Sequence, residues 1–392
     1  MNRILLLPCE RGQVQETVIS TSVQHAVNTV IHRFRRLNPQ NLRTIVGLSG
    51  GADSVALLKC LSLASKDVLA VHVIHDIRPI EESHYDLKVA RDAARVCGVD
   101  FLSLRIFPQK EAVARGENLE SCARRLRYNA LSNAAHTRLE SAEGKSFIRK
   151  DSIYYNERNL KAVIATAHHA DDQLETLLMR LCRGSGLSGM SGIASCIAAN
   201  HQCSHAIIRP MLDISRADTE AICAEYNLVY ATDASNFDET LTRNKIRHQV
   251  VPVLKSLYSK AAEHSSELAK ILASAQKVVE RQSCTCFGGD HDSSPGNWTS
   301  TSSDWLRLQE DVVIYEWITY AIRSVCNGGG VNYDKINNQM VDDVVQAIRK
   351  RKTKTYYWPS RVIEVGIEQV KIRKMYQAEI DKQENESKEK VS

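Results

Sequence analysis

The chain has 392 residues, which is long enough for two or three domains and at least one sizeable hydrophobic core. Hydrophobic residues make up 43% and charged residues 25%, as is ordinary for a soluble globular protein. No run of about 18 apolar residues occurs, so we expect no membrane span. The 51 basic and 46 acidic residues leave a net charge of only +5, so any RNA site must come from local clustering of basic residues.

The 11 cysteines form no Cys-x-x-Cys pair, and an odd number without a framework predicts reduced thiols in a cytosol-like compartment. We therefore expect a cytoplasmic protein, or one of an organellar stroma or matrix if it is eukaryotic. Residues 1–43 contain several arginines and few acids, as transit peptides do. Apolar residues recur at helical spacing between Val23 and Leu37, however, and this favours a packed amphipathic helix.

From residue 43 onward, short apolar segments alternate with helical patterns. The expected strands are 44–48, 68–74, 101–106, 162–167 and 206–209. The expected helices are 54–63, 86–97, 119–136, 171–182 and 217–226. This alternation predicts an α/β fold, in which a doubly wound parallel sheet of the Rossmann-like kind carries helices on both faces.

The remaining segments predict the domain organisation. Residues 140–159 are polar and look like a surface insertion, 254–281 return to helical spacing, and 284–303 are rich in Ser, Gly, Thr and Asp, as loops are. Helical patterns at 305–325 and 337–348 precede strand patterns at 361–365 and 370–372. We expect an N-terminal helix at residues 1–42, a catalytic domain at 43–253 and a helical region with a linker at 254–303. A small α+β domain at 304–376 and a disordered tail at 377–392 should follow.

A glycine-rich turn follows the first expected strand, and it reads Ser49-Gly50-Gly51-Ala52-Asp53-Ser54. The glycines let the backbone approach phosphate oxygens closely, and the free amides at the helix start favour an anion. Asp53 is expected to hold a magnesium ion that bridges phosphate oxygens. A simple turn with Ser and Asp as helix caps is the alternative, but this order directly after a strand favours a phosphate loop. The chain lacks the Gly-Lys-Ser/Thr and G-x-G-x-x-G signatures, so neither a Walker-type ATPase nor a dinucleotide binder fits.

Three acids, Asp171, Asp172 and Glu175, stand at the start of the helix after the fourth strand. Their spacing places them together on the flank of an apolar leucine stripe. Helix capping accounts for Asp171 alone, whereas three clustered acids favour a metal ion or a substrate ammonium group. His168 and His169 precede them, and without further ligands at metal spacing they suit the polar wall of a nucleotide site better than zinc.

Several motifs together resemble those of the tRNA(Ile)-lysidine synthetases, and the phosphate loop resembles that of the PP-loop superfamily, whose members cleave ATP between the α- and β-phosphates. The resemblance covers residues 43–257 and extends weakly to 348–374. It is carried by His168 to Thr176, Arg180 to Gly189, Asn118-Leu119-Glu120, Ala123-Arg124, Arg127-Tyr128, Arg209-Pro210, Ser215-Arg216, Asp233, Ser235-Asn236, Arg243-Asn244, Ile246-Arg247 and Pro252. The chain departs from the family's pattern at Asp76, in the run from His75 to Pro79.

The resemblance implies a two-step ligation. ATP adenylates the C2 oxygen of the wobble cytidine in an isoleucine tRNA with a CAU anticodon, and the ε-amine of free lysine then displaces AMP. Residues Ser49 to Ser54 would bind ATP, and Asp53 would hold Mg2+. Asp172 and Glu175 would bind and deprotonate lysine, and Arg243 would stabilise the developing phosphate charge. A homodimer is left open.

The expected tRNA contacts are basic residues in four segments of the chain, namely Arg124, Arg127, Arg183, Arg247, Arg349, Lys350, Arg351 and Lys352. Arg247 is also a candidate for stabilising phosphate charge. For Arg124 and Arg127 a solvated surface is an equal alternative. The run from Arg183 to Gly189 is read either as a basic loop that orders on the anticodon or as a helix C-cap followed by a linker.

Three other functions remain in view. A 2-thiocytidine synthetase has a similar phosphate loop, but it uses cysteines for sulfur transfer or an iron–sulfur cluster, and this chain has no Cys-x-x-Cys pair. An amidotransferase-type PP-loop ligase would act on a small molecule, which the basic segments oppose. A non-catalytic RNA-binding protein with a decayed nucleotide site is disfavoured by the intact Asp53, Asp172, Glu175 and Arg243.

Overall fold

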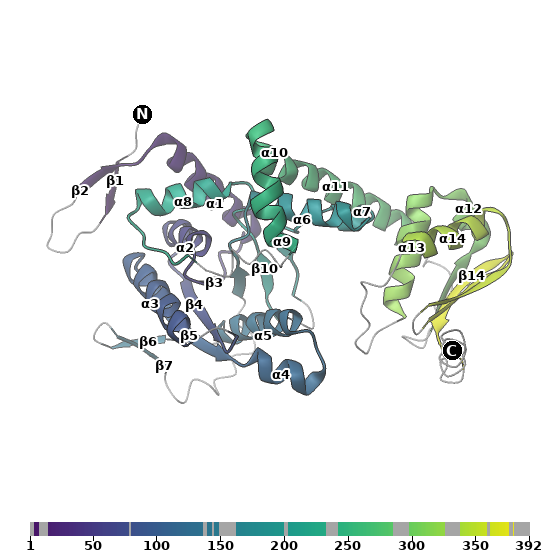
Figure 1. Ribbon diagram of the computed structural model, residues 1–392, viewed down its shortest axis with the longest axis horizontal. Helices are drawn as coiled ribbons and strands as arrows, with labels where there is room; N and C mark the ends of the chain where they lie inside the picture. The colour runs from purple at the N-terminus through teal and green to yellow at the C-terminus, as the bar shows by residue number, and fades with distance from the viewer. Residues whose placement is uncertain are drawn as a thin grey trace. The chain divides into compact units, whose positions relative to one another are not determined.

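The protein divides into two compact units. The first comprises Met1–Met179 and Gly192–Ala269, and the second comprises Arg180–Ser191 and Lys270–Ser392. The expected domain boundaries at residues 43, 254, 304 and 377 stay predictions. The computed structural model describes residues 4–7, 15–77, 80–135, 139–142, 145–148, 162–199, 203–232, 242–284, 298–325, 338–358, 361–375 and 379 (Figure 1).

A six-stranded sheet forms the centre of the first unit, in the order β5-β4-β3-β8-β10-β9. Its first five strands are parallel, and the short edge strand β9 is antiparallel to β10. The strands are β3 Arg43–Gly47, β4 Val68–His75, β5 Asp100–Ile106, β8 Ala162–Ala165, β9 Cys196–Ile197 and β10 Ala206–Ile208. The predicted doubly wound parallel sheet is therefore confirmed.

Helices cover both faces of this sheet (Figure 1). Those of the first unit are α1 Thr21–Leu37, α2 Ala52–Ala64, α3 Ile80–Val96, α4 Pro108–Arg115, α5 Leu119–Ala134, α8 Arg216–Glu225, α9 Thr242–Lys245, the π-helical turn η3 Ile246–Val250 and α10 Val251–Leu257. Two further helices, α6 Ala170–Cys182 and α11 Ala261–Cys284, begin in the first unit and end in the second.

The sequence pattern missed several features of these helices. Helices α4 and α9 and the turn η3 were not expected, and the helical spacing at 254–281 belongs to two helices rather than one. The break falls at Tyr258, whose backbone is extended (φ −137°, ψ 97°) and whose amide caps α10 by bonding to the carbonyl of Leu254. An extended residue ends the i to i−4 hydrogen-bond ladder, although the apolar spacing continues across it.

Alternate residues of the strands pack into two separate cores, because successive side chains of a strand point to opposite faces. Ile45 and Ile164 pack with Leu131 of α5 on one face. Val46 and Ala165 pack with α1, α2, α3 and α8 on the other. Burial on both faces explains why these strands read as continuous apolar runs in the sequence.

Helix α1 packs within the first unit, as the amphipathic pattern predicted. Ser20 caps the helix by accepting a hydrogen bond from the amide of Val23. The side chains of Val27, Val30 and Phe34 are at most 1% exposed and belong to the core that contains α2 and α8. Before this helix, β1 Ile4–Leu7 pairs with β2 Gln15–Val18 as an antiparallel ribbon.

The second unit is an α+β domain, as predicted. Its antiparallel sheet has the order β11-β14-β13-β12 and packs on helices α12, α13 and α14. The strands are β11 Trp298–Ser302, β12 Lys354–Trp358, β13 Arg361–Val365 and β14 Gln369–Lys374. The helices wholly in this unit are α7 Leu187–Met190, α12 Ser303–Leu308, α13 Asp311–Ser324 and α14 Asn338–Arg349.

Segments that the sequence assigned to loops or insertions also contain strands. Strand β11 lies in the Ser- and Thr-rich stretch 284–303, where it pairs with β14 at the edge of the sheet, so its polar composition does not prevent pairing. In the expected insertion 140–159, β6 Leu139–Ala142 pairs with β7 Lys145–Ile148, and residues 149–159 lie outside the described part. The tail expected to be disordered, 377–392, also lies outside it apart from residue 379. Among the described helices, none is both long and apolar enough to cross a membrane.

Replacing Phe34 by Ala should destabilise the first unit by about 3–5 kcal/mol, because it empties a fully buried aromatic site where α1 packs on α2. Chemical unfolding followed by circular dichroism measures the change. The matched control is Arg35→Ala on the exposed face of the same helix, which should change the free energy of unfolding by less than about 0.5 kcal/mol. Equal stability of the Phe34 variant and the wild type would contradict the packing of α1 in the core.

Candidate active site

The candidate site lies where the strand order reverses. β3 and β8 are neighbours in the sheet, but the chain continues from β3 to β4 on one side and from β8 to β10 on the other. In open parallel sheets, the segments that leave such a pair of strands diverge, and ligands bind in the crevice outside the carboxyl ends of those strands. The phosphate loop leaves β3, and the segment with His168 and His169 leaves β8.

The loop from Ser49 to Ser54 is held in shape by its own hydroxyl groups. The Ser54 hydroxyl donates to the Gly51 carbonyl at 2.9 Å, accepts from the Gly50 amide at 3.2 Å and lies 3.1 Å from the Ser49 hydroxyl. Gly51 is the N-cap of α2 and provides no side-chain acceptor. The first amides of α2 are thus left for an external anion, as expected of a phosphate loop.

Gly50 has a backbone conformation that requires glycine. Its φ is +96°, and a Cβ atom placed there would lie 3.1 Å from the carbonyl oxygen of Asp86. The carbonyl of Gly50 accepts a hydrogen bond from the amide of Ala231 at 2.9 Å. Any other residue at this position would be strained and would push against backbone, so the loop conformation depends on this glycine.

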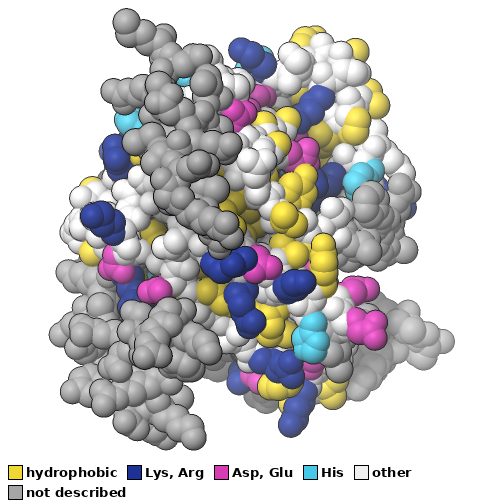
Figure 2. Space-filling view, turned by 90° about the vertical axis from the view of Figure 1, so that its left-hand side faces the viewer, with side chains coloured by type: hydrophobic (Ala, Val, Ile, Leu, Met, Phe, Trp, Pro, Cys, Tyr) yellow, Lys and Arg dark blue, Asp and Glu magenta, His cyan; other side chains and the backbone are white. Residues whose placement is uncertain are grey.

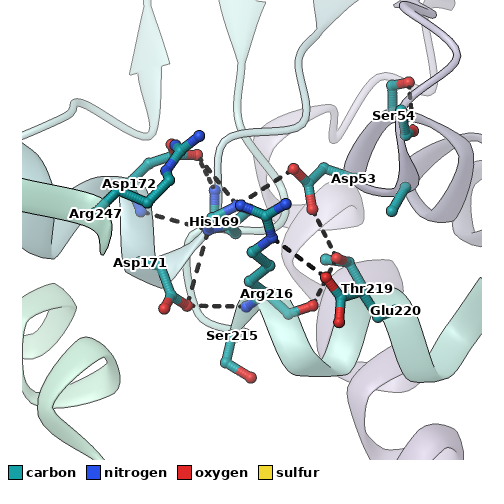
Figure 3. A network of polar contacts seen from close by, with 12 residues as sticks. Asp53, Ser54, His169, Asp171, Asp172, Ser215, Arg216, Thr219, Glu220 and Arg247 are labelled. Atoms are coloured by element: carbon teal, nitrogen blue, oxygen red, sulfur yellow. Dashed lines mark hydrogen bonds and ion pairs between the residues drawn. The ribbon is translucent and has the colours of Figure 1, made fainter. Parts of the chain in front are cut away.

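Asp53 projects from the first turn of α2 toward α8 and the β8 segment (Figure 3). Its Oδ1 accepts a hydrogen bond from the Thr219 hydroxyl at 2.6 Å, and its Oδ2 lies 3.4 Å from His169 Nε2. Burial alone would raise the pKa of Asp53, but the hydrogen bonds and charge of His169 and the Thr219 hydroxyl lower it below its ordinary value. The side chain is therefore a carboxylate at neutral pH.

Asp53 suits a magnesium ion that is shared with a nucleotide. Among the described residues, no group of three or more His, Cys, Asp and Glu side chains is placed to hold a metal by itself. Mg2+ commonly uses one or two carboxylates together with substrate phosphates and water. The single carboxylate of Asp53 beside the phosphate loop fits that donor set, and an all-protein metal cage does not.

Two arginines neutralise the acidic pair on α6. Arg243 Nε donates to Glu175 Oε2 and its Nη2 donates to Asp172 Oδ1, both at 2.8 Å. Arg247 Nε donates to Glu175 Oε1 at 2.6 Å, and its Nη2 donates to Glu175 Oε2 at 3.0 Å and to Asp172 Oδ1 at 3.3 Å. The side chain of Glu175 is only 2% exposed, so a cation is required to keep it charged there.

Asp171 lies 3.9 Å from His169 Nδ1 but does not share the arginines that hold the other two acids, and in this respect the expected cluster of three is wrong. Its Oδ2 accepts a hydrogen bond from the backbone amide of Arg216 at 2.9 Å, and its Oδ1 forms an ion pair with Lys255. Asp171 thereby ties α6 to the start of α8 (Figure 3) and, through Lys255, to α10. Helical spacing could not predict that Asp171 and Asp172 have different partners, because the partners of Asp171 come from distant segments of the chain.

The two histidines behave differently. His169 is buried, and its Nε2 lies 3.4 Å from Asp53 Oδ2 and 3.6 Å from Asp172 Oδ2. Burial alone would lower the pKa of His169, but these carboxylates raise it above its ordinary value. His168 Nδ1 pairs with the Thr166 hydroxyl at 3.0 Å, and burial lowers the pKa of His168 to about 4. His169 thus links the two carboxylates, and His168 stays neutral at physiological pH.

A family model described as a PP-loop domain matches residues 18–141 and 154–254, which is more than half of the chain. The chain belongs to the PP-loop domain family. It is also similar to proteins named tRNA(Ile)-lysidine synthase, at 33% identity over 60% of this chain for Porphyromonas gingivalis and 33% over 63% for Clostridioides difficile. These matches cover 46% and 49% of the relatives, so the chain spans about half the length of the curated relatives it matches.

Two residues of the PP-loop site were given no role from the sequence. Thr219 lies inside α8 and bonds Asp53; it stands three residues after the Ser215-Arg216 motif but is not part of it. Arg209 follows β10, is 2% exposed and donates to the carbonyl of Ala194 at 2.6 Å. Its place in the Arg209-Pro210 motif and its position after a parallel strand, where ligands bind, are the signals that would have singled it out.

The expected tRNA contacts fall in both units. Arg124 and Arg127 are exposed on α5, with the Arg124 guanidinium 5.1 Å from the ring centroid of Tyr128. In the second unit Arg183, Lys350, Arg351 and Lys352 are exposed. On the face drawn in Figure 2, the described Lys and Arg side chains alternate with hydrophobic and acidic ones instead of forming one unbroken basic surface.

Arg349 and Arg247, by contrast, are engaged within the protein. Arg349 pairs with Asp311 and donates to the backbone carbonyls of Arg307 and Gln309, so it fastens α14 to α13 and the turn before it. Arg247 contacts the acidic pair, as described above. Their assignment to tRNA stays a prediction, but the observed contacts favour internal roles.

Replacing Gly50 by Ala should abolish nucleotide binding by the PP-loop while leaving the protein folded, because the loop must shift to relieve φ and the contact with Asp86. Calorimetric titration with ATP and Mg2+ measures the loss. The matched control is Gly98→Ala, since Gly98 also has a positive φ (+66°) but an added Cβ atom would have nothing within 4 Å, so this variant should lose stability and keep its affinity. Unchanged ATP affinity in the Gly50 variant would contradict the assignment of the loop.

The low pKa of His168 predicts a dependence of stability on pH. Between pH 6.5 and about 4 the unfolded chain binds more protons at this residue than the folded protein, so the free energy of unfolding falls as the pH drops through this range. His168→Asn removes that loss of stability. The Tm of the variant minus the Tm of the wild type should therefore be larger at pH 5 than at pH 7.5. The exposed His84→Asn serves as the control. The same Tm difference at both pH values would contradict burial of a neutral His168.

Proposed function

We propose that this protein ligates lysine to the wobble cytidine of an isoleucine tRNA with a CAU anticodon, using ATP and Mg2+. The observation that carries the proposal is the convergence of the phosphate loop and the acidic pair on one crevice, with Asp53 and Asp172 on either side of His169. The similarity to proteins named tRNA(Ile)-lysidine synthase supports this choice among the functions that a PP-loop domain can serve.

In the first step, the C2 oxygen of cytidine attacks the α-phosphorus of ATP and pyrophosphate leaves. The amides at the start of α2 and the loop hydroxyls of Ser49 and Ser54 would hold the pyrophosphate portion. A magnesium ion at Asp53 would neutralise charge on the departing pyrophosphate. Thr219 and His169 keep the Asp53 carboxylate directed into the crevice through the contacts given above.

In the second step, the ε-amine of lysine attacks C2 of the activated cytidine and AMP leaves. A protonated amine has no free electron pair, so a carboxylate must accept its proton first. Asp172 or Glu175 would bind the ammonium group and take this proton. Arg243, whose side chain is 41% exposed, would stabilise the phosphate charge of the adenylated intermediate.

Sulfur transfer, the main alternative, finds little support around the loop. Cys223 lies against the start of α2 and donates to the carbonyl of Ala52 at 3.4 Å. Burial raises the pKa of Cys223 to about 12, and it raises that of Cys60 on α2 to the same value. A thiol with so high a pKa is a poor nucleophile at neutral pH, so neither cysteine suits a persulfide-carrying role.

Incubation of the purified protein with ATP, Mg2+, labelled lysine and unmodified CAU-anticodon isoleucine tRNA should transfer label to the tRNA. Glu175→Gln should lower the rate by about 10²–10⁴-fold through loss of the proton acceptor. Asp53→Asn should lower it by about 10²–10³-fold through loss of charge stabilisation. Each substitution keeps the side-chain shape.

The control for this assay is Glu82→Gln on the exposed face of α3, which should retain the wild-type rate. Thermal melting establishes that each variant is folded. If the folded wild-type protein binds ATP and transfers no lysine, the proposed reaction is wrong. If the Glu175 variant transfers lysine at the normal rate, the assignment of the acidic pair is wrong.

A further inference from the structure

The two arginines on the acidic pair hold it in different ways. Arg247 binds Glu175 side-on, with Nε on Oε1 at 2.6 Å and Nη2 on Oε2 at 3.0 Å, and makes a longer bond to Asp172 Oδ1 at 3.3 Å. Arg243 divides its two bonds between the acids, with one nitrogen on Glu175 and one on Asp172, both at 2.8 Å. The side chain of Arg247 is 19% exposed and that of Arg243 is 41% exposed, so Arg247 is the more buried and binds mainly Glu175, whereas Arg243 bridges the pair and is the more exposed to solvent.

The position of Arg243 is the one that a substrate ammonium group would need. A lysine ammonium bound by Asp172 and Glu175 has to donate to both carboxylates, as Arg243 does now. Glu175 Oε2 and Asp172 Oδ1 each accept a bond from both arginines already, which uses the two lone pairs of each oxygen. An ammonium group can therefore bind these oxygens only if one guanidinium group leaves them. The other oxygen of Asp172, Oδ2, is already used by the backbone amide of His169 at 3.1 Å.

Charge balance leads to the same conclusion. Two carboxylates and two guanidinium groups make a cluster of zero formal charge, which attracts neither a cation nor an anion strongly. An added ammonium group would make it positive. If Arg243 turns toward an anion, a single negative charge remains, and this attracts an ammonium group. The phosphates of a bound nucleotide are such an anion. The loop that would hold them includes Asp53, whose Oδ2 lies 3.4 Å from His169 Nε2, the same atom that lies 3.6 Å from Asp172 Oδ2.

We propose that Arg243 stands in for the substrate amine in the nucleotide-free protein and moves to phosphate when nucleotide binds, whereas Arg247 remains on Glu175 as a positioning residue. The inference rests on the proposed function, because it takes Asp172 and Glu175 to be the lysine site. Arg243 is suited to this exchange, since its larger exposure lets water and phosphate replace the bonds that it gives up. Arg247 is held in place by two bonds to the buried Glu175 carboxylate, at 2.6 and 3.0 Å, in addition to its longer bond to Asp172.

It follows that nucleotide and lysine bind with positive coupling. Nucleotide removes the competitor of lysine, and lysine in turn favours the state in which Arg243 is free for phosphate. The coupling is a free energy shared by the two sites, so each ligand must raise the affinity of the other by the same factor. We expect a factor of at least about 5, within the usual range of such couplings.

Calorimetric titration of the full chain with L-lysine, with and without saturating α,β-methylene-ATP and Mg2+, tests the proposal. In the wild type, lysine should bind at least about fivefold more tightly with nucleotide, and the reverse titration should give the same factor. Arg243→Gln should bind lysine more tightly than the wild type without nucleotide, and its coupling factor should fall toward 1. Arg247→Gln should weaken lysine binding in both states and keep the coupling. Arg95→Gln, a charge-matched change of an exposed arginine on α3, should leave every value unchanged.

Each result either supports or overturns the exchange of Arg243. A wild-type protein that binds lysine equally well with and without nucleotide overturns it, and so does full coupling in folded Arg243→Gln. If that variant does not fold, Arg243→Lys provides the same test, because the shorter lysine side chain lacks the planar guanidinium fork that matches carboxylate and phosphate oxygens, and its coupling should shrink. A folded wild type that binds nucleotide but never lysine overturns the proposed function itself, which is a different outcome from lysine binding without coupling.

Discussion

The carboxylates of Asp172 and Glu175 lie at the start of α6 with 12% and 2% of their side-chain surface exposed, so their charge has to be balanced inside the protein. Arg243 and Arg247 supply that balance, and to do so α9 and η3 must lie against α6. The backbone of η3 is π-helical where it carries Arg247, and such turns recur at functional sites. Removing one partner would leave the other charge buried and unpaired, which is far more costly than exchanging a partner for a ligand.

The same requirement connects the acidic pair to the phosphate loop. His169 is buried between Asp53 and Asp172, and the two carboxylates raise its pKa against the effect of burial. A bound nucleotide would add negative phosphate groups and a positive magnesium ion to this network. A bound amine would add a positive ammonium group. Ligands of opposite charge in one low-dielectric crevice influence each other, so we expect binding order and chemistry to be linked here.

Much of the site was predictable because its main motifs are local. The phosphate loop needs only a strand, a turn with Gly50 and Gly51 and a helix, and all of these are adjacent in the sequence. The acidic start of α6 could be predicted for the same reason, because its residues are also adjacent in the sequence. The separation of Asp171 from Asp172 was not predictable, since it depends on the backbone of Arg216 and on Lys255, which are far away in the sequence. The polar strand β11 was missed because its pairing with β14, and not its composition, makes it a strand.

The sequence by itself determined the fold class, the phosphate loop and the acidic helix, since each rests on periodicity or on contacts within about ten residues. Only the tertiary structure decided that β3 and β8 are neighbours, which brings Asp53 within reach of His169 across more than 100 residues of chain. It also decided that the acidic pair is held by two arginines of the chain itself, Arg243 and Arg247. The physical reason is that packing in three dimensions determines which group lies next to a buried charge. Periodicity along the chain does not predict that partner.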